Sequence, residues 1–237
     1  MQQNNIFIAA AADLVYCIDA LNSAFEQTHP NTAVRVSTSS SGNLFAQIKN
    51  GAPFDLFLSA DTAYPHELVK AGLAEESSLT TYAIGRLALW TTNEKLNVKE
   101  RGLEILRDAQ LVKKIAIANP DHAPYGRAAK AALEQAGLWN EIQDRIVLGE
   151  NIAQTAQFVQ TGNADVGIVS LSSLSSPSLR GVGDFFEIKT DPPIEQSAVL
   201  TKRGSGNTAA KAYLEFLRSN QARDILKEHG FQIPTQP

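Results

Sequence analysis

Apolar and polar positions follow a repeated order along the chain: a short apolar run, a few small or polar residues, and then apolar residues three to four positions apart. Short apolar runs predict buried strands, and the wider spacing predicts amphipathic helices. The order is clearest at residues 6–21, 35–48, 115–133 and 145–159. Each of these four junctions predicts a strand that leads to a helix N-terminus, where unpaired backbone N–H groups and the helix dipole favour an anion.

The same criteria predict the other elements of the chain. Further strands are expected at residues 54–60, 82–90, 164–171 and 194–202. Further helices are expected at residues 64–73, 103–111, 208–218 and 221–228, and the Ser- and Gly-rich residues 172–184 are expected to form a connection. Alternating strands and helices are typical of α/β proteins, in which helices cover both faces of a parallel sheet.

Composition narrows the possible partners. The chain has 237 residues, 43% hydrophobic and 19% charged, with a formal net charge of −4. This length can bury a sizeable core in one large domain or two smaller ones. The acidic balance argues against nucleic acid, whose phosphates require a clustered basic surface. A small anion remains compatible, because it responds to local N–H groups rather than to net charge.

The apolar residues before Cys17 resemble the cleavage region of a secretory or lipoprotein signal, but three features disagree. No Lys or Arg precedes Arg35, Asp13 interrupts the apolar run, and Tyr16 lies where a small residue would precede the cleaved bond. We therefore expect Met1 to begin a mature chain from which any signal has been removed. Cys17, the single cysteine, is expected to be a small buried hydrophobe.

The junction residues and the segments around them resemble one known family. The most specific motifs are GAPFDLFLSAD (51–61) and NPDHAPYG (119–126), accompanied by FIAAAADL (7–14), STSSSGNLFAQIKN (37–50), GENIAQ (149–154) and ADVGIVSLSSL (164–174). Over nearly its whole length, the chain is similar to the molybdate-binding proteins of bacterial ABC importers. The resemblance implies the two-lobed α/β fold of type II periplasmic binding proteins, each lobe a mostly parallel sheet flanked by helices, with the ligand in the cleft between lobes. It places one lobe at residues 1–83 plus 195–237 and the other at 84–194.

Ligand contacts also follow from the resemblance. It implies that Ala12 and Asp13, Ser41, Tyr125 and Ile152 surround the anion. Ser40, in the same serine run, is a further candidate, although a serine before a helix is also a common cap. Neutral donors suit molybdate, tungstate or sulfate, which accept hydrogen bonds only, better than a protonated phosphate. No cofactor is implied, and the four histidines lack the spacing of a metal-cation site.

The chain departs from the family pattern in two places, the first loop and Ser170. Ala12 stands where the best-known members carry a Ser or Thr hydroxyl, and Asp13 would repel a dianion if it faced the cleft. We expect Asp13 to be an N-cap whose side chain turns onto its own helix; a cleft-facing Asp13 would instead indicate a sulfate-like, protonated or organic anion. Ser170 lies where some members place a ligand-binding Tyr, so Tyr125 is expected to supply the phenol.

The sequence therefore predicts a monomeric binding protein that delivers molybdate or tungstate to an ABC transporter permease. The expected location is the periplasm, with the native chain either free or lipid-anchored. The sequence disfavours two other classes of protein. A hydrolase is disfavoured because no GxSxG motif is present, and a ligand-sensing module of a regulator is disfavoured because no helix-turn-helix extension is present.

Overall fold

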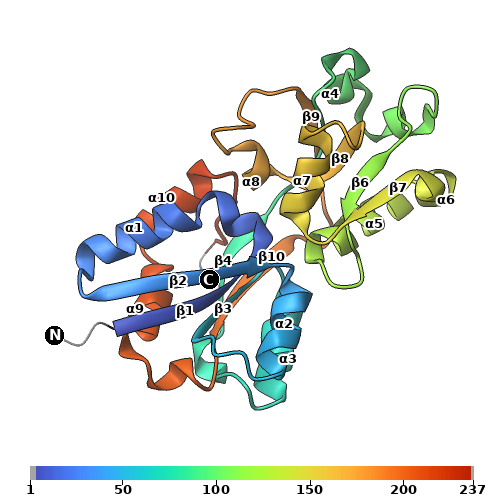
Figure 1. Cartoon of the computed structure of the whole chain (residues 1–237). Helices are drawn as coiled ribbons and strands as arrows, with labels where there is room; N and C mark the ends of the chain where they lie inside the picture. The colour runs from blue at the N-terminus through green and yellow to red at the C-terminus, as the bar shows by residue number, and fades with distance from the viewer. Residues whose placement is uncertain (1–3, 236–237) are drawn as a thin grey trace. The chain divides into compact units, whose positions relative to one another are not determined.

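The computed structural model describes residues 4–235, and the chain divides into two compact units (Figure 1). Unit 1 comprises Met1–Gly85 and Glu195–Pro237, and unit 2 comprises Arg86–Ile194. Each unit contains one five-stranded sheet with helices beside it. The α/β fold of two flanked sheets that the sequence predicts is confirmed.

The sheet of unit 1 has the strand order β2-β1-β3-β10-β4. Its strands are β1 (Asn4–Ala11), β2 (Thr32–Ser39), β3 (Leu56–Ser59), β4 (Thr80–Gly85) and β10 (Ile194–Leu200). β1 runs parallel to β2 and β3, whereas β10 is antiparallel to β3. Ala11 pairs with Ser39 in the β1–β2 register. The two strands therefore end together, at one edge of the sheet.

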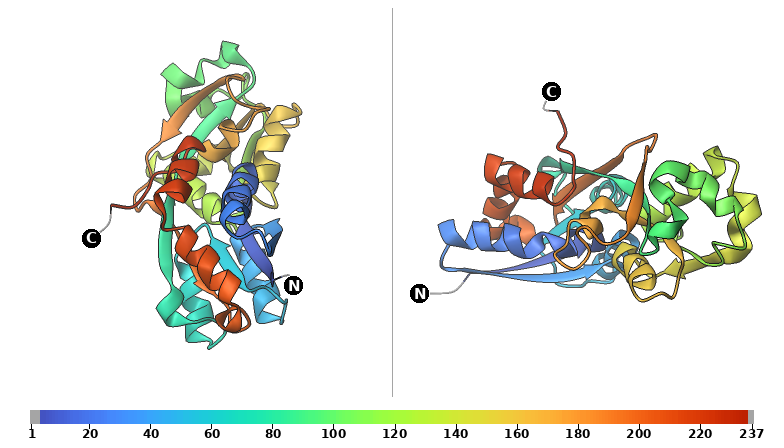
Figure 2. Two further views of the ribbon diagram at one scale, coloured as in Figure 1. Left: turned by 90° about the vertical axis from the view of Figure 1, so that its left-hand side faces the viewer. Right: turned by 90° about the horizontal axis from the view of Figure 1, so that it is seen from above.

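Helices cover both faces of this sheet, and its central strand β3 is buried at every position. Unit 1 contains α1 (Ile18–Thr28), α2 (Ser41–Lys49), α3 (Ala63–Lys70), α9 (Thr208–Phe216) and α10 (Asn220–Glu228), and the short 3-10 helices η1 (Ala12–Tyr16), η2 (Glu76–Ser78) and η6 (Gly204–Gly206). Leu56 and Leu58 belong to the core shared with α1, α9 and α10, while Phe57 between them belongs to the core under α2 and α3. Alternate residues of a strand point to opposite faces, so a continuous apolar run fills both cores. Figure 2 shows α10 beside α1 in this layer.

The sheet of unit 2 has the order β7-β6-β8-β5-β9. Its strands are β5 (Leu87–Thr91), β6 (Ile115–Ala118), β7 (Ile146–Gly149), β8 (Val166–Ser170) and β9 (Asp184–Ile188). Its helices are α4 (Val98–Arg101), α5 (Pro124–Gln135), α6 (Trp139–Ile142), α7 (Ile152–Gln160) and α8 (Leu171–Leu174), with 3-10 helices η3 (Glu94–Leu96), η4 (Gly102–Arg107) and η5 (Gln143–Arg145). β6 is parallel to β7 and β8, and β5 is antiparallel to β8 and β9. Each sheet thus has three adjacent parallel strands that begin at one edge, followed by a strand that is antiparallel to the third.

The structure differs from several of the predicted elements, and the short helices α4, α6 and α8 were not predicted. The single strand expected at 82–90 is two strands, β4 in the sheet of unit 1 and β5 in that of unit 2, because the chain passes between units after Gly85. The helix expected at 103–111 is the shorter 3-10 helix η4. β9 was not predicted, since it is an edge strand with a half-exposed pattern that follows a Ser- and Gly-rich segment.

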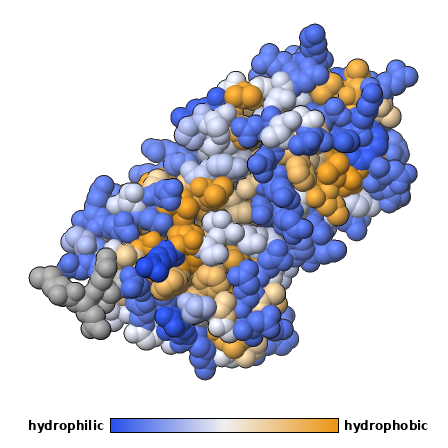
Figure 3. Space-filling view, viewed as in Figure 1, coloured by the Kyte–Doolittle hydropathy of each residue, from blue (hydrophilic) through white to orange (hydrophobic). Residues whose placement is uncertain are grey.

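One face of the molecule is mostly hydrophilic. Figure 3 shows blue residues over most of the face viewed, with orange residues in separate groups. The large hydrophobic side chains that remain exposed are Val15, Leu111, Leu148, Val182 and Phe185. Within residues 4–235, no helix has the length and hydropathy needed to cross a membrane.

Cys17 is 1% exposed at the start of α1 and packs in the apolar core of unit 1. Burial, and to a smaller extent the charge of Asp13, raises the pKa of its thiol. Since the thiolate is the reactive form, we predict that a maleimide does not label native Cys17 at mildly alkaline pH and labels it once urea unfolds the protein. Labelling followed by mass spectrometry checks this, and rapid labelling of the native chain would contradict the buried assignment.

Candidate functional site

Four of the predicted site residues lie together at the carboxyl edge of the sheet of unit 1. β1 ends at Ala11, and Ala12 and Asp13 follow it in η1. β2 ends at Ser39, opposite Ala11, and Ser40 and Ser41 follow it at the start of α2. The first residues of a helix have backbone N–H groups without intrahelical acceptors. This edge therefore presents neighbouring backbone donors from two chain segments.

The two serines have different hydrogen bonds. Ser40 is the N-cap of α2, and its Oγ accepts a bond from the N–H of Asn43 at 3.3 Å. Ser41 is 1% exposed, and its Oγ accepts a bond from the N–H of Ala60 at 2.9 Å. A hydroxyl that accepts one bond still has its own proton to donate. Ser41 is thus held in place by the segment after β3 and retains a donor.

The expectation that Asp13 is an N-cap is wrong. The N-cap of η1 is Ala11, and Asp13 lies inside the first turn, fully buried. Its Oδ2 instead accepts a hydrogen bond of 2.5 Å from Nε2 of Gln196 on β10. Oε1 of Gln196 in turn accepts a bond of 2.8 Å from the hydroxyl of Tyr82 on β4. Gln196 therefore binds the carboxylate inside unit 1.

Unit 2 has a similar edge, formed by the parallel strands β6 and β7. Ala118 pairs with Gly149, so these strands also end together. Tyr125, 2% exposed, lies in the first turn of α5, and Ile152, 3% exposed, is the first residue of α7. Tyr125 supplies a phenol and Ile152 only a backbone N–H. The predicted residues of unit 2 thus also gather at helix N-termini that follow parallel strands.

Gly126 explains why α5 can begin so close to the end of β6. A Cβ on this residue would lie 2.2 Å from the carbonyl oxygen of Ala118 and 2.8 Å from the carbonyl carbons of Ala118 and Asn119. Such distances are not tolerated between non-bonded atoms, so only glycine fits. The final glycine of NPDHAPYG therefore positions Tyr125, its neighbour in the chain.

Replacing Tyr125 by Phe removes one hydroxyl and keeps the buried ring. If the phenol donates to the ligand, the affinity should fall by about 1 kcal/mol or more, because a hydrogen bond to a charged group is lost. Isothermal titration measures the change, with Tyr64→Phe on α3 of unit 1 as a control for loss of a phenol elsewhere. An unchanged affinity would assign Tyr125 to packing.

Ser170 ends β8 and is the N-cap of α8, with its Oγ accepting the N–H of Ser173 at 3.3 Å. Its hydroxyl also bonds the hydroxyls of Ser172 and Ser173 at 2.9 and 2.8 Å. All three serines are buried. Ser170 thus belongs to a compact hydroxyl cluster at the same edge of the sheet, and its oxygen is already engaged within the protein.

The two aspartates of GAPFDLFLSAD form hydrogen bonds to other segments of unit 1. Asp55 Oδ2 accepts the N–H of Phe7 at 2.9 Å, and its Oδ1 pairs with Nε of Arg203 at 3.2 Å. Asp61 Oδ1 accepts the N–H of Tyr64 at 3.1 Å, at the start of α3. This motif therefore fixes strand β3 and the turn whose Ala60 N–H bonds Ser41.

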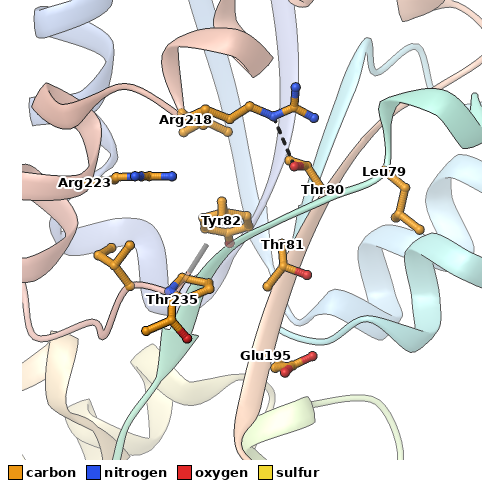
Figure 4. A pocket seen from close by; sticks show the side chains of 11 residues that line it. Leu79, Thr80, Thr81, Tyr82, Glu195, Arg218, Arg223 and Thr235 are labelled. Carbon is orange, nitrogen blue, oxygen red and sulfur yellow. Dashed lines mark hydrogen bonds between the residues drawn. The ribbon is translucent and has the colours of Figure 1, made fainter. Parts of the chain in front are cut away.

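Unit 1 contains a pocket whose lining includes Tyr82, the residue that donates to Gln196 (Figure 4). Its lining residues are Leu79–Tyr82, Glu195, Leu217, Arg218, Arg223 and Ile233–Thr235. Arg218 Nε donates to the hydroxyl of Thr80 at 3.1 Å, and its guanidinium also pairs with Glu215. None of the six predicted ligand residues lines this pocket, so we do not assign the ligand to it. Among residues 4–235, no cluster of three or more His, Cys, Asp or Glu side chains could hold a metal ion.

Sequence reasoning missed three groups that organise the site of unit 1: Gln196, Tyr82 and the N–H of Ala60. Gln196 gave no clear signal, since its neighbours Glu195 and Ser197 on β10 are polar as well. Its partner Asp13 is 183 positions away, and no spacing rule connects them.

Comparison with known proteins gives consistent matches over almost the whole chain. The family described as bacterial extracellular solute-binding protein matches residues 6–232. The molybdate-binding protein ModA of Azotobacter vinelandii is 36% identical over 236 residues, 98% of this chain and 91% of that protein. The molybdate-binding protein ModA of Rhodobacter capsulatus is 35% identical over 228 residues, 95% of this chain and 87% of that protein. The solved periplasmic molybdate-binding protein of Azotobacter vinelandii superimposes with a TM-score of 0.90 at 31% identity, covering 97% of this chain and 100% of that chain.

Proposed function

Because the chain belongs to the bacterial extracellular solute-binding protein family, we propose that it binds molybdate or tungstate in the periplasm and delivers the anion to an ABC transporter permease. Its similarity to two proteins named molybdate-binding protein ModA, at 35–36% identity, supports this ligand class. The protein would act as a monomer that binds one anion without turnover.

The observation that carries the proposal is the gathering of neutral donors at parallel strand ends. In unit 1 these are the N–H groups of the Ala12 turn and the hydroxyl and N–H of Ser41; in unit 2 they are the phenol of Tyr125 and the N–H of Ile152. A tetrahedral dianion accepts hydrogen bonds through all its oxygens and donates none. We propose that these donors bind the oxyanion.

The donor set also accounts for selectivity by protonation state. Phosphate near neutral pH still carries a proton, which would need an acceptor. The one acidic candidate, Asp13, has its Oδ2 bound to Gln196. Fully ionised molybdate, tungstate and sulfate therefore fit better than phosphate, and size would separate the first two from sulfate.

Isothermal titration of ligand-stripped protein tests the proposal. The anions are molybdate, tungstate, sulfate, phosphate and chromate at neutral pH. We expect tight one-to-one binding of molybdate and tungstate, weaker sulfate binding and no phosphate binding. Absence of binding across the whole series would overturn the proposal. A molybdate complex that elutes as a monomer in size-exclusion chromatography would support the proposed stoichiometry.

A further inference from the structure

Asp13 is a fully buried acidic residue next to Ala12, one of the proposed donors to an anion. Resting on the proposed function, we infer that Gln196 is a positioning residue for the anion site. Its amide holds the Asp13 carboxylate inside unit 1, so that the N–H groups of the η1 turn face the anion and the carboxylate does not. Gln196 is itself 0% exposed, which makes it part of the interior of unit 1.

The direction of the hydrogen bonds explains why an amide is required at this position. An ionised carboxylate only accepts hydrogen bonds, and the hydroxyl of Tyr82 donates to Gln196. The residue between them must therefore offer a donor on one side and an acceptor on the other. Glutamine does both, with Nε2 toward Asp13 and Oε1 toward Tyr82. Glutamate offers two acceptors and leucine offers neither.

The hydrogen bond from Gln196 to Asp13 has an electrostatic role. A buried carboxylate is destabilising unless polar groups hydrogen-bond it, and a negative charge near a dianion is repulsive in a low-dielectric site. The charge-assisted bond from Gln196 to Oδ2 supplies one such hydrogen bond and fixes the direction of the side chain. Tyr82 remains a donor at neutral pH, because burial, followed by the charge of Asp13, raises its pKa well above the ordinary value.

The same hydrogen bonds connect the η1 turn to two particular strands. Tyr82 is on β4, by which the chain leaves unit 1 after Gly85, and Gln196 is near the start of β10, by which it returns at Glu195. These strands are neighbours in the sheet, and Figure 4 shows Tyr82 and Glu195 on them. Hydrogen bonds therefore connect the turn that contains Ala12 to β10 directly and to β4 through Gln196. These are the two strands at which the chain passes between units.

The test exchanges the donor and the acceptor. Gln196→Glu places a second carboxyl group against Asp13, and we expect it to weaken molybdate binding by about tenfold or more, since a charge-assisted hydrogen bond becomes a repulsion. The double variant Asp13→Asn with Gln196→Glu reverses the pair, because the Asn amide donates to the Glu carboxylate. It should return to within about threefold of the wild-type affinity, as coupled residues do in a double-mutant cycle. Gln221→Glu, the same substitution at an exposed position of α10, is the matched control.

Titration with molybdate and thermal unfolding of the ligand-free variants give the readouts. Rescue of affinity by the double variant supports a positioning role, whereas wild-type affinity in Gln196→Glu overturns it, as does a folded double variant that binds no better than the single one. If Gln196→Glu does not fold, Tyr82→Phe decides, since removal of its hydroxyl should weaken binding several-fold and an unchanged affinity overturns the inference. Failure of the wild-type protein to bind molybdate would instead reject the proposed function.

Discussion

Replacing Ser41 by alanine is expected to weaken molybdate binding by about 1–3 kcal/mol, the range for leaving a buried hydrogen-bond partner unsatisfied. Ser41 is almost fully buried, and its Oγ accepts the N–H of Ala60. This bond fixes the hydroxyl so that its proton can point to the anion. Alanine would remove the donor to the ligand and leave the N–H of Ala60 without this acceptor.

Two matched variants separate binding from folding in this experiment. Ser77→Ala removes an exposed hydroxyl of unit 1 and should leave affinity unchanged. Ser40→Ala removes the cap of α2 and should lower the free energy of unfolding by about 1 kcal/mol. Isothermal titration gives the affinities and thermal unfolding the stabilities. If Ser41→Ala binds molybdate as the wild type does, Ser41 is not a ligand residue.

Local patterns predicted the strand-to-helix junctions well, because each depends on neighbouring residues. The apolar run before Ala12 forms β1, and the serine run before Leu44 provides both the end of β2 and the cap of α2. The spacing of apolar residues and the preference for a capping serine both involve residues only a few positions apart, so a single sequence is enough to recognise them. The parallel alignment of β1 with β2 then brings Ala12 and Ser41 to one edge.

Long-range pairing could not be predicted in the same way. The segment 82–90 looks like one strand because its apolar residues are continuous, yet β4 and β5 pair in different sheets. Asp13 was expected to cap its own helix, the commonest local use of an aspartate near a helix start, but Gln196 binds it across the sheet. In both cases the deciding partner lies far away in sequence, and tertiary contacts override the local preference.

Replacing Gly126 by alanine is expected to destabilise unit 2 and weaken molybdate binding together. The new methyl group would lie 2.2 Å from the carbonyl oxygen of Ala118, and the neighbouring contacts are also backbone atoms, which cannot move aside as a side chain can. The start of α5 must then separate from β6. Overpacking of this kind typically lowers the free energy of unfolding by about 1–3 kcal/mol, and contact with backbone favours the upper end.

Binding should weaken in Gly126→Ala because Tyr125 immediately precedes the strained position in the first turn of α5. Thermal unfolding of the ligand-free protein and titration well below the transition separate the two effects. Gly206→Ala is the control, since no heavy atom lies within 4 Å of a Cβ built there, and it should change stability by no more than about 0.5 kcal/mol. Wild-type stability and affinity in Gly126→Ala would mean that the β6–α5 junction can widen freely. Tyr125 lies in the helix start that the substitution would displace. A loss of stability with unchanged affinity would therefore mean that Tyr125 does not contact the anion.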